Sequence, residues 1–528
     1  MTPAATSPLS FAAIGPFAPS PKGAAALRDI TVATLDAALA DMVGSVRVLL
    51  PEALHAEGHV TVPLRELDDF APERLAALPL LRTIQRGIDL IGDARNEGQP
   101  DYRIRETLLA NGFGNILDLA APPNATVPSS APSPAPATPG SGKSGADALF
   151  DLIDAPASAT PGGSAAAWSS QLRRLGHDIL AAIASDPALR TLEAAWRGLA
   201  LVCAQPEARE GLVRIRFAAL PDPDVAASLA ALEATILDSM PSLCLVDHPF
   251  GPNPADLDGI KAVADFAETG LIPSLAWAGP SFLRLDDWAG LDRLPNLSTH
   301  METAAFAAWR SFRATPAAAW LGLCCNRIPA RARHEADPAW FGFQEPDDLW
   351  LAPVWPAAAL AMRSLAATGS FMAMAHAPVA TLRDLPLPAA YADSETVTEM
   401  ALSEHRAAQF AAVGLMPLVG VKRADAVVLA AQTATGGKPF HYPFFLNRLA
   451  GAVYEAKAAL ADLRDPAAVE ERLAAHLQTA FGRIPTLAPK RFGVQCVPMN
   501  GGMVLRVQCV PPEAALPGDP IVSLDFDW

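Results

Sequence analysis

The chain has 528 residues, enough for three to four domains or for fewer, larger ones with sizeable cores. It carries 40 Lys and Arg against 56 Asp and Glu, a formal net charge of −16. This acidic balance argues against nucleic-acid binding, which needs a concentrated basic surface, and more weakly against binding to anionic membranes. The mean hydropathy of +0.21 is high for a soluble monomer and is what large buried subunit interfaces would give.

The sequence predicts a cytoplasmic protein with reduced thiols. Its N-terminus lacks the basic start and the continuous apolar stretch of a secretory signal. The most apolar region, residues 354–382, is interrupted by Pro356, Arg363, His376 and Pro378, so no transmembrane helix is predicted. The six cysteines are scattered and form no Cys-x-x-Cys motif, which favours buried free thiols.

A Pro-, Ala-, Ser- and Gly-rich linker at residues 121–146 divides the chain. It carries a single charge, at Lys143, and cannot bury a core, so we expect it to be extended or disordered. It separates a block at residues 1–120 from a larger block at residues 168–528. Residues 147–167 are predicted to contain a short amphipathic helix and a flexible segment.

The first block is predicted to alternate short strands and helices. Strands are expected at Leu9–Ile14, Val46–Leu50 and His59–Val62, and a helix at about Thr34–Met42. A further helical region follows, in which apolar residues recur at helical spacing: Leu78, Leu81, Ile84, Ile88 and Ile91.

The larger block shows a β-α-β rhythm. Strands are expected at Leu212–Leu220, Ser242–Val246, Ile272–Trp277 and Trp320–Cys325. Helices are expected between them, at about Val225–Ser239, Pro254–Thr269 and Thr303–Arg313. This alternation predicts an α/β fold with a largely parallel sheet covered by helices.

The end of the chain, residues 492–528, departs from this rhythm and gives the fold an α+β character. Phe492–Val497 and Met503–Val510 flank Asn500-Gly501-Gly502, a strong hairpin signal, and Ile521–Phe526 is predicted as a last strand. The turn places Cys496 near Leu505 and not opposite Cys509, so no disulfide is predicted there.

No catalytic, cofactor-binding or metal-binding residue is predicted. Residues 140–144, GSGKS, resemble the end of a phosphate-binding loop, but Ala137 stands where the full motif needs glycine and no strand precedes it. The His and Cys residues show no metal-ligand spacing, and no GxGxxG motif follows a strand. An α/β enzyme with an unrecognised site stays an alternative, because fold does not determine function.

The stretch Leu189–Val202, LRTLEAAWRGLALV, is the most informative in the chain. Its apolar residues fall close to one helical face, and Glu193 and Arg197 form an i,i+4 pair, features that an ordinary core helix would share. The sequence LEAAWRGL, however, closely resembles a signature of the large sheath subunit (TssC or VipB) of the bacterial type VI secretion system. Leu192, Glu193, Trp196 and Arg197 take the positions of that signature.

Further landmarks resemble the same family in the same order. They are DHPF at 247–250, SFLRLDDWAGL at 281–291, AAWRSFRATPAAAWLGLCCNRIPAR at 307–331, FQEPDDLW at 343–350 and SEHRAAQFAAVGLMPLVG at 403–420. The residues on family positions include Trp309, Arg310, Arg327, Arg331 and Trp350. The sequence departs from the pattern at Cys324-Cys325-Asn326, where the family has a proline before the motif arginine, and it is shorter than usual after Gly436.

Residues 1–120 resemble the small sheath subunit (TssB or VipA). The likeness rests on ELDDFAPERL at Glu66–Leu75, on the L-x-x-I-Q-x-x-I-D-L helix after it, and on a strand that ends in Gly15-Pro16-Phe17. The two subunits are normally separate chains. The resemblance therefore implies a fused sheath protein, with a mixed sheet covered by helices and with terminal strands that complete the sheets of neighbouring subunits.

The resemblance also implies the function and the partners. It implies a structural subunit that polymerises into a helical tube around an inner tube and contracts to drive that tube outward. The implied partners are further copies of the chain, an Hcp-like inner tube protein, a baseplate and a ClpV-type AAA+ unfoldase, within a cytoplasmic part of a membrane-anchored injection machine. A non-contractile or baseplate relative of the sheath fold is the alternative.

Two sets of residues follow from this resemblance as candidate contact sites. The candidates for strand exchange between subunits are Leu9, Phe11, Ile14, Ile521, Val522, Leu524 and Phe526, because an unpaired edge strand readily accepts another chain. Pairing of both strands within their own chain is the alternative. The candidates for unfoldase binding are Leu149, Phe150, Leu152 and Ile153, at a position comparable to the helix that ClpV grasps in the family. Packing of this short helix on its own domain is the alternative, and the fusion removes the free terminus.

Overall fold

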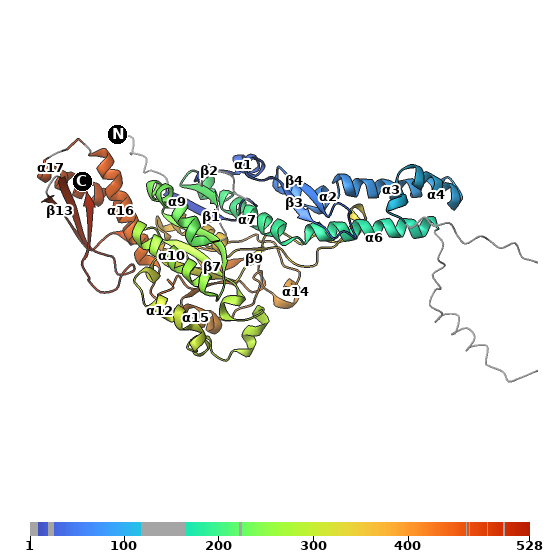
Figure 1. Ribbon diagram of the computed structural model, residues 1–528. Coiled ribbons are helices and arrows are strands. Elements are labelled where there is room, and N and C mark those ends of the chain that lie inside the picture. The colour runs from blue at the N-terminus through green and yellow to red at the C-terminus, as the bar shows by residue number, and fades with distance from the viewer. Residues whose placement is uncertain are drawn as a thin grey trace, which may run out of the picture.

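The computed structural model describes residues 9–19, 26–117, 164–220, 224–460, 462–463, 465–482, 484–499 and 502–528. A central α/β body carries a helical arm on one side and a small α+β unit on the other (Figure 1). The arm is built from helices of residues 79–110 and 165–184, and the α+β unit from residues 441–528.

An eight-stranded sheet forms the centre of the body, in the order β12-β11-β8-β7-β6-β1-β5-β2. Its strands are β1 (Leu9–Gly15), β2 (Arg28–Ile30), β5 (Val213–Ala219), β6 (Leu243–Phe250), β7 (Ser274–Ala278), β8 (Leu321–Cys325), β11 (Leu415–Gly420) and β12 (Val427–Leu429). The six inner strands run parallel, and β2 and β12 pair antiparallel at the two edges. Every residue of β7 and β8 is buried, as expected for parallel strands with helices on both faces. The predicted largely parallel, helix-covered sheet is confirmed.

Strand β1 lies in the middle of this sheet, between β5 and β6. Phe11 is the register partner of Ile215 on one side and of Leu243 on the other. The four residues from Phe11 to Ile14 are fully buried, which favours an interior position for such an apolar strand. Strand exchange at Leu9, Phe11 and Ile14 would need an open edge on β1. In the structure both edges of β1 are paired within the chain, so this strand has no open edge.

Alternate strand residues point into two separate cores. Phe11 and Ala13 of β1 join the core on one face, whereas Ala12 and Ile14 join the core on the other. The first core is covered by α7 (Pro187–Cys203) and α13 (Val354–Thr368), and the second by α9 (Val225–Ser239) and α10 (Pro254–Gly270). Residues 354–362 of α13 are all buried, so the most apolar segment of the sequence is a core helix.

The arm joins the two blocks of the sequence. It contains α3 (Pro79–Asn96) and α4 (Asp101–Ala110) from the first block and α6 (Ala165–Ala184) from the second, with α3 packed along α6 (Figure 1). A Cβ at Gly87 would lie 2.6 Å from Phe113 Cε1 and 2.8 Å from Leu172 Cδ1, so glycine permits this close approach. At the base of the arm lie α1 (Leu35–Met42), α2 (Pro72–Leu75) and a separate hairpin of β3 (Gly44–Leu49) and β4 (His59–Leu64).

The α+β unit has a core of its own. Two helices, α16 (His441–Ala459) and α17 (Pro466–Gly482), pack against an antiparallel sheet of β13 (Arg491–Met499), β14 (Gly502–Val510) and β15 (Val522–Asp527). Cys496 is opposite Leu505 and Cys509 is opposite Phe492, so the predicted hairpin register is confirmed.

Shorter elements complete the body. They are α8 (Pro206–Arg209), α11 (Leu297–Met301), α12 (Ala307–Arg313), α14 (Tyr391–Ser394), α15 (Glu404–Ala412), β9 (Ile328–Pro329) and β10 (Trp350–Leu351). The helix expected from Thr303 begins instead at Ala307, after a 3-10 turn at Ala304–Phe306. In the part of the chain that the structure describes, no helix is long and apolar enough to cross a membrane.

Candidate functional site: the motif cluster and the C-terminal sheet

The LEAAWRGL motif forms the middle of α7. The helix starts cleanly because Pro187 takes its first position and the Asp186 carboxylate accepts a hydrogen bond from the Leu189 amide at 2.9 Å. Its buried face includes Leu192, Trp196 and Leu199, which confirms the apolar face expected from the sequence.

Trp196 connects this helix to the N-terminal block. Its indole Nε1 donates a hydrogen bond to the Phe17 carbonyl at 3.0 Å, in a fully buried position. The rings of Phe17, Trp196, Phe217 and Trp355 meet edge to face, at centroid distances of 5.3 to 6.0 Å. Residues from the blocks on the two sides of the linker at 121–146 therefore share one aromatic core.

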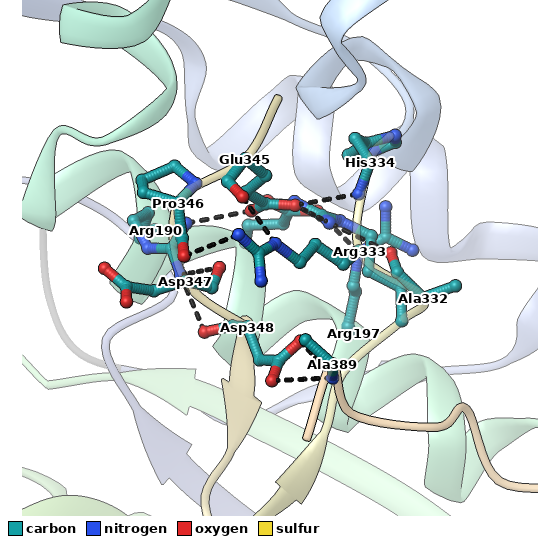
Figure 2. Close-up of polar contacts among 12 residues, drawn as sticks. Arg190, Arg197, Ala332, Arg333, His334, Glu345, Pro346, Asp347, Asp348 and Ala389 are labelled. Carbon is teal, nitrogen blue, oxygen red and sulfur yellow. Dashed lines mark hydrogen bonds and ion pairs between the residues drawn. The ribbon is translucent and has the colours of Figure 1, made fainter. Parts of the chain in front are cut away.

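Glu193 and Glu345 are the two carboxylates of a buried ion-pair cluster. Figure 2 shows Glu345 of this cluster beside Arg190. Arg331 Nε donates to Glu193 at 2.7 Å and its Nη1 donates to Glu345 at 2.6 Å. Arg197 Nε reaches Glu193 at 2.7 Å, and Arg190 Nη1 reaches Glu345 at 2.9 Å. Both carboxylates are almost fully buried, so the arginines supply the charge that burial requires.

The pKa shifts of the cluster have opposing causes. Burial by itself would raise the pKa of Glu345, but hydrogen bonds and charge from Arg331, with help from Arg190, hold that pKa below its usual value. Burial would lower the pKa of Arg331, yet the two carboxylates raise it, so this guanidinium stays charged. The cluster connects α7 to the two segments that contain Arg331 and Glu345.

The other motif arginines also bond within the chain. Arg327 makes a two-point contact with Glu399, at 2.8 and 2.6 Å, and lies over the Trp350 ring. Arg310 Nη1 donates to the Met301 and Thr303 carbonyls. Trp309 is buried in the core on the opposite face of the sheet from α7. The structure thus brings Leu192, Glu193, Trp196, Arg197 and Arg331 together and places Trp309 and Arg310 elsewhere.

Two buried polar residues were not identified from the sequence. Asn326 has a φ of +72°, and its side chain bonds the Met400 amide and carbonyl and the Leu418 carbonyl at 2.8 to 3.0 Å. Asparagine tolerates this left-handed conformation, which explains how it can precede the motif arginine in place of proline. Asp247, in the DHPF landmark, is the second of these residues. In the sequence each of them directly follows an apolar run, residues 243–246 before Asp247 and residues 321–325 before Asn326.

The C-terminal strand β15 forms one edge of its sheet. Leu524 and Phe526 point into the core of the α+β unit, and Val522 packs beside them. β15 pairs with β14 alone among the described residues, and Ile521 just before it is 71% exposed. The Lys457 ammonium bonds the Asp527 carbonyl at 2.6 Å and covers one end of this edge. The candidates Leu149, Phe150, Leu152 and Ile153 lie outside the described residues.

Among the residues that the structure describes, no group of three or more His, Cys, Asp or Glu side chains could hold a metal ion. Burial raises the pKa of the Cys203 and Cys244 thiols to about 12, which makes them poor nucleophiles.

Comparison with known proteins identifies a relationship. Residues 239–435 match the family model described as EvpB/VC_A0108, tail sheath N-terminal domain. The type VI secretion system sheath protein TssC1 of Pseudomonas aeruginosa is 27% identical over 289 residues. This chain is similar to a type VI sheath protein. The aligned residues make up 48% of this chain and 57% of the length of TssC1.

The matched sheath region contains much of the geometry described above. It includes Asp247, Trp309, Arg327, Arg331 and Trp350, whereas the LEAAWRGL motif and residues 1–120 lie outside it. Both descriptions name a structural sheath component and not an enzyme. A chain of a solved structure, "Cryo-EM structure of the anti-feeding prophage (AFP) baseplate, 6-fold symmetrised", is 16% identical with a TM-score of 0.37, covering 63% of this chain and 80% of that one.

Proposed function

We propose that this chain is a structural subunit of a contractile sheath, in which a small-subunit-like block and a large-subunit-like block are joined in one polypeptide. The observation that carries the proposal is the match of residues 239–435 to the tail sheath domain model. Trp196 and Phe17 support the fusion, because one buried hydrogen bond and a shared aromatic core connect the two blocks.

Assembly is proposed to use the free edge of β15. Ile521, Val522, Leu524 and Phe526 lie on or beside this strand, and backbone groups on an open edge accept a further strand. Contacts between unlike surfaces of identical subunits build a helical filament where they do not close into a ring. Of the two strands predicted for strand exchange, β1 is paired on both sides. We therefore place the contact on β15, which has an open edge.

The sheath is proposed to polymerise in the bacterial cytoplasm around an Hcp-like inner tube, starting at a baseplate. Contraction would then be a switch between two packed subunit arrangements that drives the inner tube outward. We also propose that a ClpV-type unfoldase recycles the contracted sheath. It would bind the residues Leu149, Phe150, Leu152 and Ile153.

The test is electron microscopy of the purified full chain, alone and with an Hcp-like tube protein. Hollow helical tubes are expected, and two distinct lengths or diameters are expected if the tubes contract. Uniform small particles under all conditions would rule out self-assembly as the main function.

A proline substitution tests the β15 edge without removing the strand. The Trp528 amide bonds the Met503 carbonyl, so by strand alternation the Ser523, Asp525 and Asp527 backbone groups face the open edge. Ser523→Pro removes one of these edge donors and should abolish tubes, whereas Ser523→Ala keeps the donor and should assemble. Tubes of normal yield from a folded Ser523→Pro protein would place the contact elsewhere while leaving the sheath function standing.

A further inference from the structure

An open crevice lies at the carboxyl ends of the central parallel strands. Pro16 follows β1, Asp247 lies near the end of β6, Trp277 lies near the end of β7, and Arg327 follows β8. These residues line a cavity of about 320 Å³ together with Arg190 of α7, residues 348–350 and Ala352. Side chains from four strands and a helix therefore meet at one place.

This crevice occupies the switch point of the sheet topology. From β1 the order of parallel strands continues to β5 on one side, and from β6 it continues to β7 and β8 on the other side. At such a point the connections leave in opposite directions and open a space outside the strand ends. In open α/β sheets this is where ligands bind.

Asp247 is placed in the crevice by an irregularity in β6. Leu245 pairs with Leu275 and Pro249 with Trp277, so four residues of β6 span the same distance as two residues of β7. Such bulges redirect a side chain and recur beside functional sites. The Asp247 side chain accepts hydrogen bonds from Trp277 Nε1 at 2.9 Å and from Trp355 Nε1 at 2.8 Å.

The two arginines that line the crevice are ion-paired with other residues, whereas its two carboxylates form no ion pair among the described residues. The guanidinium of Arg190 is paired with Glu345, and that of Arg327 is paired with Glu399. Asp247 is 93% buried, since its exposed fraction is 7%, and it has no cationic partner within the described residues. Asp348 likewise forms no ion pair there, and its carboxylate accepts only the Ala389 amide (Figure 2). Two carboxylates that take part in no ion pair among the described residues thus line the crevice, beside the indoles of Trp277 and Trp350.

We propose that this crevice is a binding site for a guanidinium or alkylammonium group, whose positive charge pairs with Asp247 and Asp348 and whose stem packs against Trp277 and Trp350. Uncompensated carboxylates attract a cation most strongly where water is partly excluded, and indole faces add a cation–π attraction. The group belongs either to a small amine or to an Arg or Lys side chain of another protein. The site shares no residue with the β15 edge.

Cation binding should be linked to the proton on Asp247. Burial raises the pKa of this carboxyl to about 6, although the two indole hydrogen bonds lower it. The other ionisable groups lining the crevice are Arg190, Arg327 and Asp348; His248, the next residue, faces Asp256. A bound cation lowers the pKa of Asp247, so binding near pH 6 releases protons, and affinity rises from pH 5 to 7 and then levels off.

Calorimetric titration of the full chain at pH 6 tests the proposal. The probes are agmatine and the capped peptide N-acetyl-Gly-Arg-Gly-amide, each in two buffers of different ionisation enthalpy. Asp247→Asn should weaken binding by about tenfold or more and remove the proton release, because it deletes the buried charge. Asp348→Asn, at a less buried position, should weaken binding less and keep the proton release. Asp258→Asn, an exposed carboxylate on α10 with the same charge change, is the matched control and should bind like the parent chain.

The outcomes separate the sources of the ligand group. Binding of agmatine alone identifies a small amine, and binding of the peptide identifies a side chain of a partner protein. If neither probe binds at concentrations up to about 10 mM, the proposal is overturned, because the binding free energy would then be weaker than about 3 kcal/mol. Binding that is unchanged in both Asp247→Asn and Asp348→Asn overturns it as well. If Asp247→Asn does not fold, the loss of affinity in Asp348→Asn decides.

Discussion

Gly198 of the LEAAWRGL motif is held at its position by the neighbouring helix. A Cβ there would lie 2.4 Å from both Cδ1 and Nε1 of Trp355, a distance that real Cβ atoms do not reach. Trp355 is itself fully buried and is held through its indole by Asp247. The glycine of the motif is therefore a packing residue that lets α7 and α13 approach each other.

We predict that Gly198→Ala destabilises the fold by about 2 kcal/mol or more, because overpacking a filled core displaces a large ring. The matched control is Gly92→Ala in α3, where a Cβ would meet no atom within 4 Å. That substitution should leave stability unchanged or raise it by about 0.5 to 1 kcal/mol through helix propensity. Urea unfolding of both variants checks the pair. Equal effects at the two sites would contradict the packing argument.

Asp247 gives the stability of the chain a pH dependence of unusual sign. Burial raises its pKa to about 6 in the folded state, against an ordinary value of 3.8. Between these two values the folded chain keeps a proton that the unfolded chain has lost. The contribution of this carboxyl to stability therefore falls as pH rises from about 4 to 6, by about 3 kcal/mol in total, and stays low above pH 6.

The difference in unfolding free energy between the parent chain and Asp247→Asn isolates this effect, because other groups contribute equally to both proteins. We predict that this difference shifts in favour of the variant as pH rises from 4 to 6 and is constant above pH 7. Denaturant unfolding at intervals of pH measures it. A difference that is flat across the window would show that Asp247 titrates at its ordinary value.

At the scale of elements, the buried ion cluster fixes how three segments meet. Glu193 and Arg190 come from α7, Arg331 follows β9, and Glu345 precedes β10. Arg331 bonds Glu193 across 138 residues of sequence, and Arg190 bonds Glu345 across 155. Phe70, Pro72 and Leu75, from the ELDDFAPERL stretch of the first block, lie against the same cluster. Residues of both blocks of the sequence therefore meet at this cluster.

We predict that Glu193→Gln destabilises the fold by about 3 to 5 kcal/mol, because it leaves Arg331 and Arg197 without one buried counter-charge. The control is Asp525→Asn, which removes the two-point contact of Arg506 with Asp525 on the exposed face of the C-terminal sheet. That surface pair should contribute little. Thermal unfolding of the two variants provides the comparison, and a larger loss for Asp525→Asn would contradict the role of the cluster.

Local patterns predicted most of these elements. The alternation of apolar residues placed β3, β4 and β5 within two residues of their ends, and the Asn500-Gly501 turn fixed the register of β13 and β14. The ion cluster was beyond prediction, since nothing in the spacing of Glu193, Arg331 and Glu345 shows that they converge. The partners of Asp247 could not be predicted for the same reason, because the indoles that donate to it come from residues 277 and 355.

At the scale of the whole molecule, the position of β1 was the largest departure from expectation. A short apolar strand near one end of a sequence has the same pattern whether it pairs at an edge, in another chain or in the centre of a sheet. Pairing across about 200 residues of sequence, with the 213–219 and 243–250 strands, is set by topology, which no local pattern records. The buried run from Phe11 to Ile14 is the one residue-level feature that favours the centre.

Hydrogen exchange measures this arrangement directly. The amides of residues 11–14 should be among the slowest in the chain, because β1 is paired on both sides and opens only when the central sheet opens. The amides of β2 and β15 should exchange faster, since each of these strands has one partner. The protection of β1 should be the same in isolated subunits and in tubes, while β15 should gain protection on assembly. Protection of β1 that appears only in tubes would instead mean that this strand is shared between subunits, and the chain would then join its neighbours through both of its terminal strands.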